Sequence, residues 1–154
     1  MSSEEQKTIP KESRQGDAHT ADFGEHKIDV YKLIHLSGAL EKETVPISEL
    51  EKFKYNNYWK DANNNWLGPQ QILDEVNKYQ GNPDWNEIIT NHPEWEDEIK
   101  KILKADYKKH PIIIVEGIVI DGMHRLTKAW IDKVDIVEVK RFQKLPEETI
   151  MTEY

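Results

Sequence analysis

The stretch IIIVEGIVIDGMHRLTKAW, residues 112–130, constrains the fold most, because its first half has the pattern of strands and its second half has the pattern of a helix. Its first half is rich in β-branched residues, and each apolar run beside the Glu-Gly pair is too short for a buried helix. We therefore expect residues 111–115 and 118–121 to form two strands of a hairpin. Residues 124–133 have apolar side chains at helical spacing, so a helix should follow the second strand directly.

The rest of the chain predicts further helices and strands around this hairpin. Strands separated by helices, together with one hairpin, indicate an α+β fold, that is, a small mixed sheet packed with helices. A helical insert should separate the first strand from the hairpin. The other expected elements are helices at 27–40, 68–80 and 92–109, a helical turn at 48–53, a loop at 54–68, and strands at 43–48 and 135–142.

Three of these segments carry more specific expectations. Pro46 lacks a backbone donor, so the strand at 43–48 should lie at a sheet edge or begin there. Ser48 should cap the helical turn that follows. The helix at 92–109 has acidic residues in its first turns and lysines in its last, which matches the helix dipole. Its apolar face is expected to contain Trp95, Ile99, Ile102 and Leu103.

Composition limits the class of protein. The 154 residues suit one domain with a tail, which we place at 26–145, with a disordered arm at 1–25 and a C-terminal tail at 146–154. The net charge of −8 argues against nucleic acid as a partner, because non-specific binding requires a basic face. The absence of cysteine excludes disulfides and thiolate chemistry. Without a membrane span or signal peptide, we expect a cytoplasmic protein with no membrane partner.

The turn between the second hairpin strand and its helix collects polar groups suited to phosphate. Gly122 permits a sharp turn after Asp121, and Asp121 could hold a divalent cation or orient a nucleophile. His124 and Arg125 fall in the first helical turn, where backbone N–H groups already favour an anion. Lys128, one turn later, could also reach a phosphate. The alternative is structural, with these residues serving as a turn, a cap and surface ion pairs.

The order of these parts resembles the ParB/sulfiredoxin-like superfamily. The resemblance rests on residues 110–142, HPIIIVEGIVIDGMHRLTKAWIDKVDIVEVKRF, with a short Glu-Gly turn, the V-I-D-G-x-H-R motif and a final strand. Upstream, ETVPISELE at residues 43–51 looks like the opening strand of the same fold. Similarity is greatest to compact bacterial and phage members without an assigned role and to the free-serine-kinase branch.

In that superfamily the strand–turn–helix binds the phosphates of a nucleotide. ParB proteins use it for CTP, sulfiredoxins for ATP, and the serine-kinase branch for an adenine nucleotide. The resemblance therefore implies ATP or another nucleotide as cofactor, with Asp121 on the side of a bound Mg²⁺. It implies nucleotide contacts from Gly122, Met123, His124 and Arg125. Lys128, one helical turn after His124, is a fifth candidate for such a contact.

The same comparison limits the activity. Met123 stands where sulfiredoxins carry their reactive cysteine, which excludes reduction of a sulfinic acid. The arginine-rich box and the helix-turn-helix of ParB are absent. The kinase branch places a catalytic glutamate early in the fold, for which Glu43, Glu49 and Glu51 are candidates. Our catalytic set is Asp121, His124 and Glu49.

Three functions follow as hypotheses. The leading one is a phosphotransferase resembling a small-molecule kinase, or a nucleotide hydrolase, acting on a nucleotide and a small-molecule acceptor. The second is a non-catalytic adaptor that senses a nucleotide and binds a protein partner through residues 1–25. The third, a ParB-like DNA-binding protein or nuclease, is disfavoured by the net charge.

A second cluster of interest is aromatic. Trp59 and Trp66 flank an asparagine-rich segment that also carries Tyr55 and Tyr58. These rings either tether the loop to the rest of the protein or form a stacking surface for a base. That base could belong to a nucleotide or to a single-stranded nucleic acid.

Overall fold

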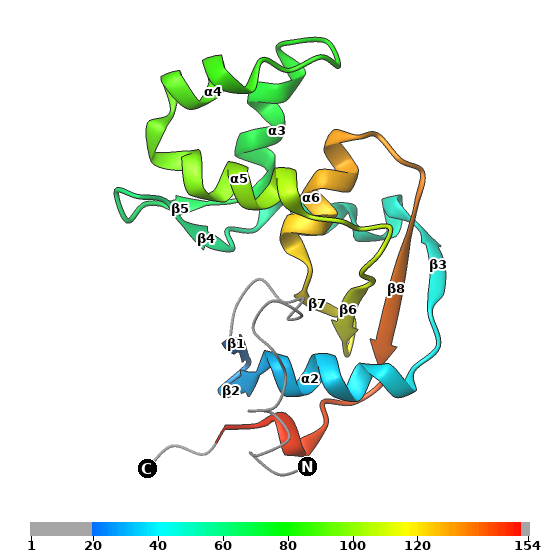
Figure 1. The fold of residues 1–154 in the computed structure, drawn as a ribbon. Helices are drawn as coiled ribbons and strands as arrows, with labels where there is room; N and C mark the ends of the chain where they lie inside the picture. Colours follow the sequence, from blue (N-terminus) through cyan, green and yellow to red (C-terminus); the bar gives the residue numbers. More distant parts are fainter. Residues whose placement is uncertain (1–19, 152–154) are drawn as a thin grey trace. The chain divides into compact units, whose positions relative to one another are not determined.

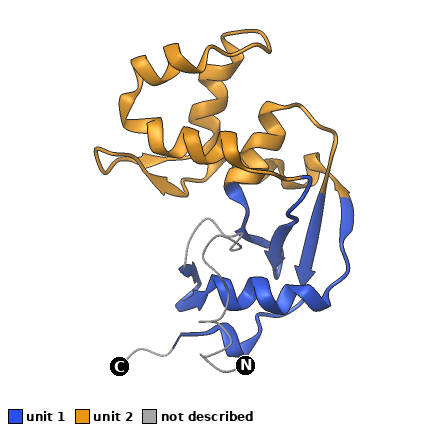
Figure 2. Ribbon diagram, in the orientation of Figure 1, with its two compact units in different colours: residues 1–44, 108–123, 138–154 blue, residues 45–107, 124–137 orange. Residues whose placement is uncertain are grey.

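The computed structural model describes residues 20–151 of the chain (Figure 1). These residues form two compact units, which are described separately below (Figure 2). Among the described residues, the first unit comprises 20–44, 108–123 and 138–151, and the second comprises 45–107 and 124–137. Helices and mixed sheets make this an α+β protein, as the sequence predicts.

A four-stranded sheet is the centre of the first unit. Its strand order is β3-β8-β6-β7, with β6 antiparallel to β7 and parallel to β8. Glu116 and Gly117 link β6 to β7 with φ values of 50° and 81°, the left-handed conformation that a two-residue hairpin turn requires. The predicted hairpin is therefore confirmed, and Pro46 does lie on an edge strand. The bounds are β3 Glu43–Pro46, β6 Ile112–Val115, β7 Ile118–Asp121 and β8 Ile136–Phe142.

Helix α2 (Val30–Leu36) packs on this sheet through Leu33, which is buried against Ile113 and Val115 of β6. The helix begins at Val30 rather than at residue 27. The carboxylate of Asp29 accepts a hydrogen bond from the backbone N–H of Lys32 at 3.1 Å and caps the helix at this point. A 3₁₀ turn, η2 (Ser37–Ala39), follows the helix.

Residues 26–29 form strand β2 (His26–Asp29), which pairs in antiparallel fashion with β1 (Thr20–Phe23). The prediction of a disordered arm at 1–25 is therefore wrong for its last residues. Thr20–Phe23 form strand β1, in which Ala21 lies opposite Ile28 of β2. Most of that arm, residues 1–19, lies outside the described residues. At the other end, the helical turn η5 (Glu147–Thr149) leads to Met151, whose N–H donates to Lys27.

The second unit is mainly helical and contains the predicted insert. Helix α4 was not predicted, because its short sequence WNEIITN carries few strong helix formers. The segment 54–68 is not a simple loop, since it contains the antiparallel hairpin β4–β5. The elements are η3 Ile47–Tyr55, β4 Trp59–Lys60, β5 Trp66–Leu67, α3 Pro69–Asn77, α4 Trp85–Asn91, η4 Pro93–Trp95 and α5 Glu96–Lys104; α6 Met123–Ile131 begins in the first unit and continues here.

Two details of this unit differ from the sequence expectation. Helix η3 begins at Ile47 with Pro46 before it, so Ser48 is not its cap. Trp95 at the end of η4 is buried, and Ile99 and Ile102 of α5 continue its buried side at i+4 and i+7. Leu103, the next residue around the helix, is 37% exposed and lies outside the apolar face. No helix among residues 20–151 combines the length and apolar character that crossing a bilayer requires.

Candidate functional site

The predicted strand–turn–helix is present. Strand β7 ends at the buried Asp121, and α6 begins at Met123, one residue earlier than expected. Gly122 joins them with φ of 110°, a conformation that residues with a Cβ rarely adopt. The glycine is therefore needed for the chain to turn directly from the strand into the helix.

The first turn of α6 is buried and carries basic groups. His124 and Arg125 are each 3% exposed, and Met123 is also buried. No acidic residue occupies this turn. The positive end of the helix dipole disfavours a cation there, so a buried guanidinium is an unusual choice for a purely structural position. The helix dipole and the two basic side chains favour an anion at this helix end, whereas the carboxylates of Asp121 and Glu98 oppose it.

The residues of the motif divide between the two units. Asp121, Gly122 and Met123 belong to the first unit, whereas His124, Arg125 and Lys128 belong to the second. The contacts of His124 below are therefore those within the second unit.

The imidazole of His124 is held by two neighbours from other elements. Its Nε2 lies 2.6 Å from Oε2 of Glu98 on α5. An ionised carboxylate only accepts hydrogen bonds, so Nε2 is the donor. Trp59 of β4 stacks on the ring with centroids 4.6 Å apart and planes inclined by 13°. The pair is largely buried, since the side chain of Glu98 is 12% exposed. These contacts place a proton on Nε2 and fix the orientation of the ring.

Glu98 is the residue that sequence reasoning missed. It lies among acidic residues that match the helix dipole, and nothing in that pattern separates it from its neighbours Glu96 and Asp97. Its position one turn after Trp95, on the buried side of α5, is the only available signal. Of the predicted candidates, Glu49 lies exposed on η3, Glu43 pairs with Arg141, and Glu51 pairs with Lys54.

Lys128 lies at the other end of α6. Its Nζ is 2.8 Å from Oδ1 of Asp132, and the hydroxyl of Tyr107 donates to Oδ2 of the same carboxylate at 2.7 Å. Lys128 therefore neutralises Asp132, which gives it a structural contact beside its predicted phosphate role.

The hydrogen bond between Tyr107 and Asp132 predicts a late titration of the tyrosine. Burial and then the hydrogen bond to Asp132 raise the pKa of Tyr107 to about 12, against 10.0 for a free phenol. A raised pKa means that its stabilising contribution is complete below pH 10 and disappears as the pH rises through 12. Phenolate absorbance, taken as the difference between the wild type and Tyr107→Phe, should show this late titration. Asp132→Asn should lower the pKa; a wild-type Tyr107 that titrates at its ordinary value contradicts the contact.

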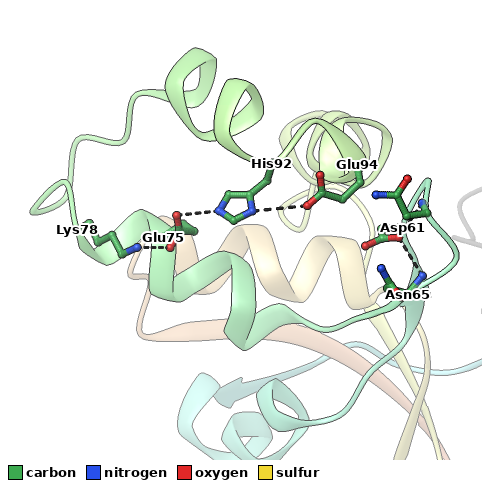
Figure 3. Close-up of polar contacts among 7 residues, drawn as sticks. Asp61, Asn65, Glu75, Lys78, His92 and Glu94 are labelled. Atoms are coloured by element: carbon green, nitrogen blue, oxygen red, sulfur yellow. Dashed lines mark hydrogen bonds and ion pairs between the residues drawn. The ribbon is translucent and has the colours of Figure 1, made fainter.

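A second imidazole in the same unit has a similar environment (Figure 3). His92 lies between two carboxylates, with Nε2 3.0 Å from Glu75 and Nδ1 3.6 Å from Glu94. Its ring stacks on Trp95 with centroids 3.9 Å apart. The ion pair with Lys78 is the main reason that the pKa of Glu75 is lowered, and His92 adds to it. His92 thus connects α3 to η4 and offers a matched comparison for His124.

The predicted metal site has limited support from the chain's own ligands. Among residues 20–151, no cluster of three or more histidine, aspartate or glutamate side chains could hold a metal ion. Mg²⁺ at nucleotide sites is commonly held by one or two carboxylates, with water and phosphate oxygens completing its octahedron. A single aspartate such as Asp121 could serve as the one protein ligand, provided that the nucleotide and water supply the other oxygens.

Comparisons with models of protein families, with curated protein sequences and with solved structures found no match to this chain. The resemblance to the ParB/sulfiredoxin-like superfamily therefore stays a prediction from the sequence motif.

Proposed function

We propose that the chain binds the phosphate groups of a nucleotide at the first turn of α6 and transfers or hydrolyses a phosphoryl group. The observation that supports this best is the buried pair His124 and Arg125 at the start of that helix. The turn before it depends on Gly122. The N–H groups of a first helical turn, together with an imidazole and a guanidinium, are chemically suited to phosphate oxygens.

Each residue has a defined role in this proposal. The backbone N–H groups of α6 and the planar fork of Arg125 bind and neutralise phosphate oxygens. As an imidazolium, His124 would donate from Nδ1 to the phosphoryl group while its Nε2 donates to Glu98, and Trp59 stacks on the ring to keep it in place. Glu49 on η3 accepts the proton of the acceptor hydroxyl or water. Met123 contributes its backbone N–H group to phosphate binding.

Asp121 would hold a Mg²⁺ ion bound together with the nucleotide, and that ion would neutralise charge on the phosphates. ATP is the first nucleotide to test, and the acceptor is a small molecule. Such a reaction suits the cytoplasm, where nucleotides and Mg²⁺ are available.

The alternative is a binding module that senses the nucleotide without turnover. It is favoured by the contacts of His124, because an imidazole held between a carboxylate and an indole is also a good structural element. The similar environment of His92 strengthens that alternative. In this case residues 1–25 would bind a protein partner.

Calorimetric titration with ATP, ADP and CTP in the presence of Mg²⁺ tests the shared claim of both functions. We expect heat of binding with at least one nucleotide, and a folded protein that gives none with any of them contradicts the proposal. Detection of released phosphate then separates the two. Sustained turnover supports the enzyme, and binding without product supports the sensing module.

A further inference from the structure

The second unit contains a pocket whose lining includes no residue of α6 or of the turn before it. It has a volume of about 370 Å³ and lies where η3 and its following segment approach β5 and the start of α3. Gly68 is required for this approach, because a Cβ there would come within 2.3 Å of the carbonyl oxygen of Asn56. The side chains that line the pocket are Lys54, Tyr55, Asn57, Trp66, Gln70 and Gln71.

Two aromatic rings at this pocket are unusually exposed. Trp66 is 57% exposed and Tyr55 is 67% exposed. Trp66 lies on the short hairpin β4–β5, where its cross-strand partner is Lys60. Exposed indole and phenol rings offer flat faces on which a planar ligand can stack. Of the two sequence interpretations for these aromatics, tethering suits the buried Trp59, and a stacking surface suits Trp66.

Lysines lie at and near the pocket. The segment KFKYNNYWK, residues 52–60, has three lysines and is flanked by Glu51 and Asp61; of the three, Lys54 lines the pocket. The ammonium of Lys60 lies 4.4 Å from the centroid of the Trp66 ring. Lys54 lines the pocket and is paired with Glu51, so its charge is partly compensated. A ligand at this pocket should therefore combine a planar ring with an anionic group.

The amides of the pocket present complementary hydrogen-bonding groups. Gln71 accepts a hydrogen bond from Gly68 N–H through Oε1, which leaves its NH₂ group as the donor. Gln70 donates through Nε2 to Asp74 at 2.7 Å, which leaves its oxygen as the acceptor. The edge of a nucleobase needs such a donor and acceptor pair. A carbohydrate would also stack on Trp66, but it would not use the lysines.

We propose that this pocket binds one nucleotide unit, with its base stacked on the face of Trp66 that Lys60 does not cover and its phosphate at the edge of that ring, within reach of Lys60. Gln70 and Gln71 meet the polar edge of the base. The unit is either a free nucleotide or part of a single strand, and both sources present the same chemistry. The proposal does not depend on the nucleotide at α6, since none of the lining residues belongs to that helix or to the turn before it.

The test measures binding of a fluorescently labelled oligothymidylate and, by calorimetry, of AMP and UMP to the full chain at low salt. Trp66→Ala should weaken binding by about 5- to 150-fold, the equivalent of one stacked base. Trp66→Phe should retain much of the affinity because it keeps a ring. Lys60→Gln should weaken binding and flatten its salt dependence, whereas Lys100→Gln, which removes an exposed lysine of α5 that pairs with Glu96, should change neither.

Each outcome decides the proposal. Binding of the oligonucleotide alone identifies a single strand as the source, and binding of AMP or UMP identifies a free nucleotide. No binding of any probe by the folded wild type overturns the proposal. Binding that Trp66→Ala leaves intact but Arg125→Gln removes also overturns it, because the nucleotide would then occupy α6 alone. Thermal melting shows whether each variant is folded, and the exposure of Trp66 makes its replacement tolerable.

Discussion

Replacing His124 with alanine is expected to lower the rate of phosphate release from the nucleotide by about 100- to 1000-fold. The physical reason is that a preorganised donor, fixed by Glu98 and Trp59, disappears from the site where negative charge develops. Initial rates of phosphate release at saturating nucleotide measure the effect. A folded His124→Ala protein with unchanged turnover would show that this imidazole has only a structural role.

Two further variants separate chemistry from folding. Glu98→Gln keeps the size of the side chain but loses the charged acceptor, so it should lower the rate less than His124→Ala and shift the pH profile of the reaction. His92→Gln removes an imidazole with the same kind of carboxylate and indole neighbours elsewhere in the unit. It should leave turnover unchanged. Equal losses in the His92 and His124 variants would point to a general loss of folding.

Replacing Leu126 with alanine is expected to lower the free energy of unfolding by about 2–5 kcal/mol. Leu126 lies on α6, one residue after Arg125, and is fully buried. Its truncation removes apolar contacts and leaves a cavity in a packed interior. The loss is a large fraction of the roughly 5–15 kcal/mol by which such proteins are stable. Urea denaturation followed by circular dichroism measures it.

Leu103→Ala is the matched control for that prediction. It is the same substitution on another helix, α5, at a side chain that is 37% exposed. We expect a clearly smaller loss, because less apolar surface leaves a buried environment. If Leu103→Ala lowers the free energy of unfolding as much as Leu126→Ala does, Leu103 belongs to the apolar face of α5 after all.

The sequence predicted best where local pattern and tertiary structure agree. The run IIIVEGIVID is short, β-branched and broken by a Glu-Gly pair, and it forms the hairpin β6–β7 that this pattern indicates. The α6 helix after Gly122 follows for the same reason. The start of α2 was placed too early, because the extended state of residues 26–29 depends on pairing with β1, which local helical spacing does not reveal.

The site shows the same division between local and long-range information. Gly122, His124 and Arg125 are neighbours in sequence, so their place at one turn could be predicted. Glu98 could not be, since 26 residues separate it from His124 and only the packing of α5 brings it there. Likewise, nothing in the asparagine-rich segment indicates that Trp59 is buried on an imidazole while Trp66 is exposed.

The most direct test of the central claim is a ¹H–¹⁵N correlation spectrum of the labelled full chain, recorded while ATP and Mg²⁺ are added. Phosphate bound at the start of α6 should move the backbone amide signals of Gly122, Met123, His124 and Arg125 more than any others. If ATP binds and these four signals stay in place, or if the spectrum does not change at all, phosphate does not bind at this helix.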